Sequence, residues 1–379
     1  MPALLVSPVV RDRWGYRRTT AAGLCVALAG ALVFAFADAT AWLFAARVLQ
    51  GVAIGLCSGA LTATLARTDP AGNTRRAGLV TSTATTAGGG LGPVLAGVMA
   101  SSLPAPARLC YLAEAGVLAL ALVGSRWLPA GLGRTRDRRH GIRRPGAPAG
   151  HRRAFWLACA VSFIAWAVTA VFLSIMPSYV RSLTHSGSLI IAGLASGLVL
   201  LVAAVTQQPA ARIDEATGQR AGLAAMALGL VVLLAAGRTH LLALVIASAV
   251  IAGSGQGLAF MGAVRTVNAA TSPGEHASVL ACFYLATYLG VGIPVIGVGL
   301  IATSSGAATA VNIFAILALA AAVAIAGVHP SRTTLHAGSP RSGAGPWDAV
   351  DAVDGSGRIG RVVTLRGVAW RAPGGRGLP

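Results

Sequence analysis

The sequence predicts an all-α polytopic membrane protein that crosses the bilayer about ten times. Three observations lead to this fold class: long apolar stretches separated by short loops, a composition with 55% hydrophobic and only 11% charged residues, and arginines that gather in every second loop. The mean hydropathy of +0.72 agrees with it. A large water-soluble domain is excluded, because soluble chains carry about a quarter charged residues.

The individual spans follow from the thickness of the bilayer. Its core of ~30 Å takes ~20 apolar helical residues to cross, and only a helix satisfies its own backbone polar groups in lipid. In chain order, we expect spans at residues 19–37, 42–66, 78–100, 107–128, 154–177, 188–209, 220–237, 240–263, 277–303 and 307–328.

The formal net charge of +19 indicates membrane topology rather than nucleic-acid binding. Most arginines precede the first span or lie in the loops after the second, fourth, sixth and eighth spans, whereas the alternate loops hold only Arg108, Arg181 and Arg238. By the positive-inside rule, the arginine-rich loops and both termini are cytoplasmic. We therefore expect a multi-pass protein of the plasma (inner) membrane that contacts lipid and no nucleic acid.

A linker rich in Arg, Gly and Pro, residues 129–153, separates an N-terminal half (1–128) from a C-terminal half (154–329). Residues 330–379 have no periodic apolar face, so we expect a disordered cytoplasmic tail there. Similar residues recur across the linker at offsets of 201 to 206: Gly15 and Gly218, Gln50 and Gln256, Pro70 and Pro273, Pro93 and Pro294. This repeat predicts two related helical units with a substrate path between them.

Three motifs resemble those of the major facilitator superfamily, and specifically of its twelve-helix drug/proton antiporter branch. The segment Asp12-Arg13-Trp14-Gly15-Tyr16-Arg17-Arg18 resembles the loop between that family's helices 2 and 3. Residues 47–55, RVLQGVAIG, are similar to its helix 4 motif. Gly88, Gly92, Pro93 and Gly97 match the antiporter motif of helix 5, with Ala96 in place of one glycine. The resemblance covers about residues 7–329.

The same resemblance shows where the chain departs from the family. If the Asp12 segment follows helix 2, the ten spans correspond to helices 3 to 12, and helix 1 and most of helix 2 have no counterpart. The N-terminal half would then be truncated. The alternatives are a start placed too late, a decayed gene, or a reduced form that works.

Two ionisable residues within spans are candidates for proton coupling. Arg47 lies about five residues into its span, and a charge inside the membrane is a functional candidate by default; the resemblance assigns Arg47 to proton coupling. Glu114 enters from the same side on another span, so it lies at nearly the same depth, where a pair with Arg47 would lower the cost of both charges. The alternatives are that Arg47 snorkels to the outer interface and that Glu114 binds Arg108.

The resemblance assigns other residues to gating and to the direction of transport. Candidates for a cytoplasmic gate are Asp12, Arg13, Gly15, Arg17, Arg18, Asp214 and Arg220. Gly88, Gly92, Pro93 and Gly97 form the antiporter-like helix motif, whose alternative role is helix packing. Gln50, Gln256 and Asn312 are amides in spans that could contact a substrate, although bonding between helices is the more common use of such amides.

No segment of the sequence carries a catalytic motif, a metal-ligand spacing or a cofactor fingerprint in the structural context that it needs, so we expect no enzyme, no metal and no cofactor. The expected function is secondary active transport, specifically proton-coupled efflux of small amphipathic or drug-like molecules by alternating access. The expected partners are the small-molecule substrate and protons, and we expect a monomer. The alternatives are an incomplete membrane protein that transports nothing and an importer of small nutrients from the same superfamily.

Overall fold

The computed structural model describes residues 2–68, 74–128, 146–148, 150–184, 188–271, 276–328, 348–353 and 359–364. Ten long helices dominate it, which confirms the expected all-α membrane fold. They are α1 (Pro2–Ala35), α2 (Thr40–Thr68), α3 (Thr74–Ser102), α4 (Pro106–Gly124), α5 (Arg152–Thr184), α6 (Leu189–Ala210), α7 (Glu215–Thr239), α8 (Leu242–Ala269), α9 (His276–Ser305) and α10 (Ala307–Val328). A short 3-10 turn, η1 (Ser125–Trp127), follows α4.

Each predicted span coincides with one of these helices, but they differ in apolar character. In the part of the chain that the structure describes, nine helices are long and apolar enough to cross a membrane. The exception is α3, because its stretch TSTATTAGGG, residues 81–90, replaces apolar side chains with hydroxyls and glycine. This helix therefore depends more than the others on what it packs against.

The first helix extends further than the sequence predicted. A helical stub is expected at residues 3–10 and a loop after it, but the motif segment of residues 12–18 is itself helical on both sides of Gly15, where the backbone kinks with φ 78° and ψ 165°. Residues other than glycine rarely adopt such backbone angles, which explains why the change of direction falls on Gly15. The Thr19 hydroxyl donates to the Gly15 carbonyl at 2.9 Å and stabilises the start of the second segment.

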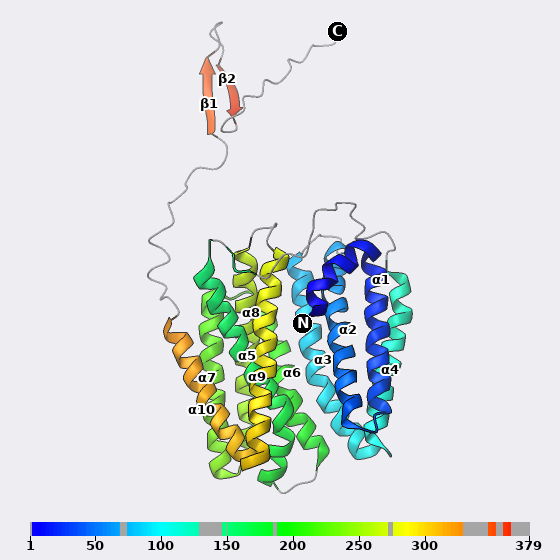
Figure 1. Ribbon diagram of the computed structural model, residues 1–379. Coiled ribbons are helices and arrows are strands. Elements are labelled where there is room, and N and C mark those ends of the chain that lie inside the picture. The colour runs from blue at the N-terminus through cyan, green and yellow to red at the C-terminus, as the bar shows by residue number, and fades with distance from the viewer. Residues whose placement is uncertain are drawn as a thin grey trace. The chain divides into compact units, whose positions relative to one another are not determined.

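Successive helices alternate in direction, and they form two groups, α1–α4 and α5–α10 (Figure 1). The end at which the odd-numbered helices begin carries most of the arginines and is called the arginine-rich end below. Corresponding helices have the same neighbours in both groups: α1 packs on α2 and α4, as α7 packs on α8 and α10. This is the packing expected of a duplicated unit.

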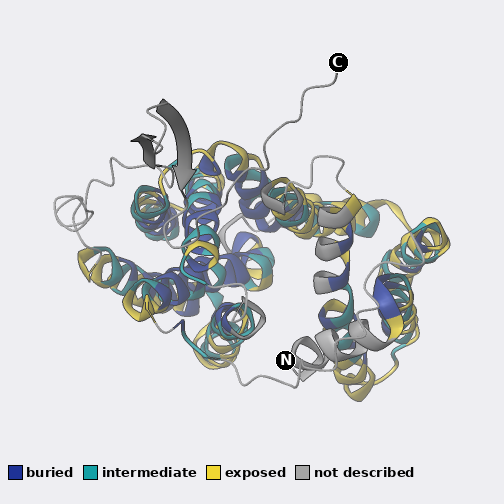
Figure 2. Ribbon diagram, turned by 90° about the horizontal axis from the view of Figure 1, so that it is seen from above, coloured by how far each residue is buried: buried dark blue, intermediate teal, exposed yellow. Residues whose placement is uncertain are grey.

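The buried core lies in the C-terminal group. Its cluster of buried apolar side chains runs from Phe155 to Ala322 and draws on all six helices from α5 to α10. In α5, 67% of the most apolar stretch of the helix is buried, whereas in α4 the share is 6%. Figure 2 shows buried and exposed positions along the helices, seen from above. The α5–α10 group is thus a packed bundle, whereas α1–α4 present most of their apolar side chains to their surroundings.

Residues 330–379 form a unit separate from the helices. Within this tail, for which the sequence predicts disorder, an antiparallel hairpin pairs β1 (Asp348–Val353) with β2 (Ile359–Thr364). The register sets Asp348 opposite Thr364 and Asp351 opposite Arg361. The basic linker falls largely outside the described residues.

Candidate functional site

Arg47 is held in the first turns of α2 by two neighbours. Its guanidinium donates to the Gln50 side-chain oxygen at 3.0 Å, one turn further along the same helix. The guanidinium carbon also lies 5.1 Å from the centre of the Phe34 ring, on α1. A cation over an aromatic face is stabilised by the ring quadrupole. Gln50, expected as a substrate contact, is therefore engaged with Arg47 in this structure.

The Phe34 ring connects Arg47 to α4. It stacks on the Tyr111 ring with centroids 4.8 Å apart and an interplanar angle of 10°. Glu114 lies three residues beyond Tyr111 on the same helix, α4. Phe34 and Tyr111 thus lie between the helices that carry Arg47 and Glu114. Both are described, and the ion pairs of the described part of the chain do not include a direct contact between them.

The gate residues predicted near the N-terminus are only partly visible. Arg17 is partly exposed and Arg18 is exposed, both just after the Gly15 kink. The backbone of Asp12 and Arg13 is helical, but their side chains lie outside the described residues. Gly15 has a structural role in the kink, as described above.

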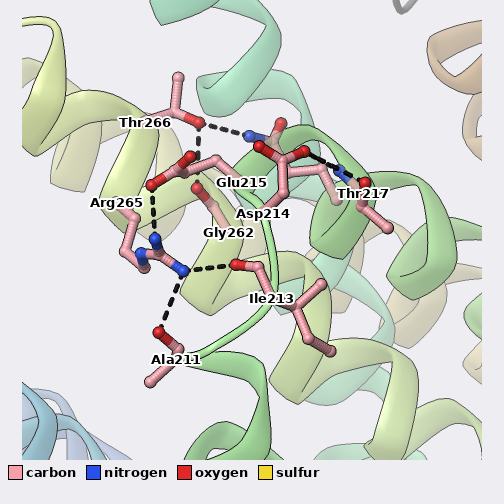
Figure 3. A network of polar contacts seen from close by, with 9 residues as sticks. Ala211, Ile213, Asp214, Glu215, Thr217, Gly262, Arg265 and Thr266 are labelled. Atoms are coloured by element: carbon pink, nitrogen blue, oxygen red, sulfur yellow. Dashed lines mark hydrogen bonds and ion pairs between the residues drawn. The ribbon is translucent and has the colours of Figure 1, made fainter. Parts of the chain in front are cut away.

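The C-terminal counterpart of this segment contains an ion pair that the sequence interpretation missed (Figure 3). Arg265, near the end of α8, contacts the Glu215 carboxylate at 2.6 Å. Its other terminal nitrogen donates to the carbonyls of Ala211 at 3.1 Å and Ile213 at 2.5 Å, which follow α6. One guanidinium therefore ties the ends of α6, α7 and α8 together. In the sequence, Arg265 was only one of the loop arginines, since its partners lie about 50 residues away.

Asp214, predicted as a gate residue, caps α7. Its carboxylate accepts hydrogen bonds from the Thr217 backbone N–H and hydroxyl, both at 3.1 Å. Capping satisfies an N–H that a helix start leaves unpaired, so the helix start is a sufficient reason for an aspartate here. Arg220, the other predicted gate residue of this half, lies one turn into the same helix and is partly exposed.

The antiporter-like motif divides into two parts in the structure. A Cβ added at Gly97 would lie 2.5 Å from the Leu189 carbonyl of α6, so only glycine permits this approach. The Pro93 carbonyl likewise contacts Gly193. Gly88 and Gly92, in contrast, have no neighbour within 4 Å of an added Cβ. Two of the four motif residues therefore build the contact between the two groups of helices.

The contact between α3 and α6 is called the seam below. Gly90 also belongs to it, because an added Cβ would lie 2.8 Å from the Leu201 nitrogen. Toward the arginine-rich end, hydrogen bonds replace glycine contacts. The buried Gln207 amide accepts from the Ser82 hydroxyl at 3.0 Å and donates to the Thr86 hydroxyl at 3.1 Å. The next residue, Gln208, donates to Thr83 at 2.9 Å.

Gln256 and Asn312 occupy different environments. Gln256 is the fifteenth of the 28 residues of α8 and is 0% exposed, and both its amide nitrogen and its oxygen lack a hydrogen-bond partner. Burying an unpaired amide costs roughly 1–3 kcal/mol by mutational measures. Asn312 lies near the start of α10, where its side-chain oxygen is 3.4 Å from a Cβ added at Gly237 on α7. The structure therefore does not join the two amides into one site.

Metal binding has no support in the described residues, among which no group of three His, Cys, Asp or Glu side chains is placed to hold an ion. The free cysteines are distributed over several helices without a disulfide among them. The ionisable side chains of the site are those of the Arg47 cluster and of the Arg265 ion pair.

Comparison with known proteins identifies the family. The family model described as Major Facilitator Superfamily matches residues 2–220. No curated protein matches the sequence. Among solved structures, a POT family transporter in complex with 5-aminolevulinic acid superposes with a TM-score of 0.64 at 14% identity, covering 86% of this chain and 85% of that one.

Two further structures share the fold at similar identity. The proton:xylose symporter XylE, bound to 6-bromo-6-deoxy-D-glucose, gives a TM-score of 0.61 at 15% identity over 87% of this chain and 83% of its own. A POT family transporter in complex with a thioalcohol-conjugated peptide gives 0.61 at 15% identity over 85% and 84%. The chain belongs to the Major Facilitator Superfamily and is a multi-pass membrane transporter rather than an enzyme.

Proposed function

We propose that this secondary transporter exports small amphipathic molecules in exchange for protons. The observation that carries the proposal is the Arg47 cluster: a cation inside a membrane helix, held by Gln50 and the Phe34 ring, with Glu114 within its electrostatic reach. A carboxyl group beside a fixed cation can bind and release a proton as its surroundings change. Glu114 is thus the proton carrier in this mechanism, and Arg47 is the fixed cation of the cluster.

Alternating access in this proposal uses the seam between the two groups of helices. The hydrogen bonds of Gln207 and Gln208 close its arginine-rich end, and the contacts of Pro93 and Gly97 close the other end. Opening one end while the other stays closed exposes the path to one side at a time. Gly88 and Gly92, which contact nothing on α6, leave room for α3 to bend at Pro93.

The arginine-rich end is cytoplasmic in this proposal, and both termini lie on that side of the plasma membrane. The gate consists of Asp12, Arg13, Arg17 and Arg18 beside the Gly15 kink, with Asp214 and Arg220 in the other half. The Arg265–Glu215 pair supports that gate by fixing the ends of three helices. The protein acts as a monomer whose partners are lipid, protons and the substrate.

Import of a small nutrient is the second candidate function. It is favoured by the fold shared with a proton:xylose symporter, and the same Arg47 cluster would then couple uptake to proton entry. The two candidates differ in direction: an exporter moves substrate against the proton flow, and an importer moves it with the flow.

The test is gradient-driven flux in proteoliposomes with an acidic lumen, sorted by orientation of the protein. Two amphipathic probes are used: ethidium, a permanent cation, and radiolabelled chloramphenicol, which is uncharged. In the orientation whose arginine-rich end faces outward, antiport accumulates a probe inside as protons leave. Arg47→Gln and Glu114→Gln should abolish accumulation, whereas Arg108→Gln, an exposed arginine on the same side, should retain it.

Equal accumulation by wild type and both variants would refute the role of the cluster. Accumulation that requires an acidic exterior, so that probe and proton enter together, would favour the importer instead.

A further inference from the structure

Three buried polar atoms stand out in the middle of the C-terminal group. They are the amide oxygen and nitrogen of Gln256 on α8 and the indole nitrogen of Trp166 on α5, and none of them has a hydrogen-bond partner. Two other glutamines are equally buried, Gln207 and Gln219, but both are bonded, Gln207 to Ser82 and Thr86 and Gln219 to the Thr266 hydroxyl at 2.6 Å. Since buried polar groups are normally satisfied, the unpaired amide and indole point to a ligand.

The two side chains are linked through Phe260 of α8. The Trp166 ring meets the Phe260 ring edge-on, with centroids 5.6 Å apart. Gln256 precedes Phe260 by four residues and so lies on the same face of α8, one turn away. Phe260 in turn stacks on Phe283 of α9 at 6.3 Å. Aromatic rings thus border the unpaired hydrogen-bonding groups.

The surroundings carry no charge. Residues 156–180 of α5 and 242–264 of α8 contain no Asp, Glu, Lys, Arg or His, and neither do residues 189–210 of α6 and 279–303 of α9. An ionised ligand group would therefore lose its hydration without gaining a counter-charge, which is strongly unfavourable. An uncharged group with both a donor and an acceptor suits the Gln256 amide, which offers one of each, and the indole N–H adds a donor.

We propose that the Gln256 amide and the Trp166 indole bind an uncharged aromatic amide, or a group of the same chemistry within a larger substrate. The ligand's amide pairs with Gln256 through two hydrogen bonds, its carbonyl also accepts from Trp166, and its ring lies beside Phe260. The site is near the middle of both helices, at the depth where transporters hold their substrates. This inference builds on the proposed function, because it names the substrate class of the same transporter.

The test compares three molecules that share one ring and differ in charge: benzamide, benzoate and benzamidinium. The full chain is placed in lipid nanodiscs, and saturation-transfer NMR measures the binding of each molecule without a proton gradient. Benzamide should bind, and the two ions should bind at least tenfold more weakly. Gln256→Met should weaken benzamide about tenfold, which equals about 1.4 kcal/mol, and Trp166→Phe should also weaken it. Gln219→Met is the matched control and should bind benzamide as wild type does.

Thermal unfolding without any probe separates a ligand site from a site filled by water. The Gln256→Met variant loses an unpaired amide, so its Tm should equal or exceed that of wild type. The Gln219→Met variant loses the hydrogen bond to the Thr266 hydroxyl, so it should unfold at a lower temperature. An equal drop in both variants would show that bound water satisfies Gln256, and the proposal would fall. Equal binding of all three molecules would overturn it as well. Binding without gradient-driven flux would refute the transport mechanism alone, and flux without selective benzamide binding would refute this site alone.

Discussion

Replacing Gln207 with leucine should open the arginine-rich end of the seam. The substitution introduces an apolar side chain of similar size and removes two hydrogen bonds between α3 and α6, to Ser82 and Thr86. Bonds between membrane helices contribute ~0.6 kcal/mol each on average, because the freed hydroxyls find backbone partners on their own helix. The closed end should therefore lose about 1 kcal/mol, which shifts the ratio of closed to open states about fivefold.

Pulsed EPR distances can measure this shift. Spin labels at Gly78→Cys on α3 and Arg212→Cys just after α6 occupy exposed positions at that end of the seam, in a background without the five native cysteines. Gln207→Leu should increase the long-distance population, and Gln208→Leu, which loses one bond, should increase it less. Thr85→Ala is the control, since the Thr85 hydroxyl bonds only within α3. Unchanged distances in Gln207→Leu would refute the reasoning.

Three further changes follow from contacts in the structure. Gly97→Ala should disturb the seam, because the added methyl meets the α6 backbone at 2.5 Å, whereas Gly92→Ala, with nothing within 4 Å, should preserve the same EPR distances. Arg265→Gln should lower unfolding stability by about 1–3 kcal/mol through lost charge-assisted bonds, and the exposed Arg212→Gln should not, as thermal unfolding in detergent will test. Gly15→Ala should cost about 1–3 kcal/mol of backbone strain at φ 78°; a Tm within error of wild type would contradict the kink.

Much of the fold was predictable because the bilayer imposes one length and one kind of helix. The ten spans and the alternation of arginines follow from that constraint. The α1 kink was only half predicted: the motif marked Gly15 as special, but a short polar segment was read as a loop, while the chain stays helical on both sides of it.

The seam and the Arg265 pair escaped prediction because they join residues that are distant in sequence. Ser82 and Gln207 are 125 residues apart, and no periodic pattern connects them. One signal was present: two adjacent glutamines end an otherwise apolar span, where lipid offers amides no partner. The unpaired state of Gln256 was beyond the sequence altogether, since Gln207, Gln219 and Gln256 look alike until their neighbours are known.

The weak apolar character of α3 has a consequence for how the protein is made. Its hydroxyl-rich stretch enters the membrane poorly by itself, since insertion depends on the summed hydropathy of a segment. The helix that satisfies those hydroxyls, α6, is synthesised about a hundred residues later. Until α6 is made, α3 is only weakly inserted in the bilayer or remains at the insertion machinery. The arrival of α6 would then complete the N-terminal half and join it to the C-terminal half in a single step of assembly.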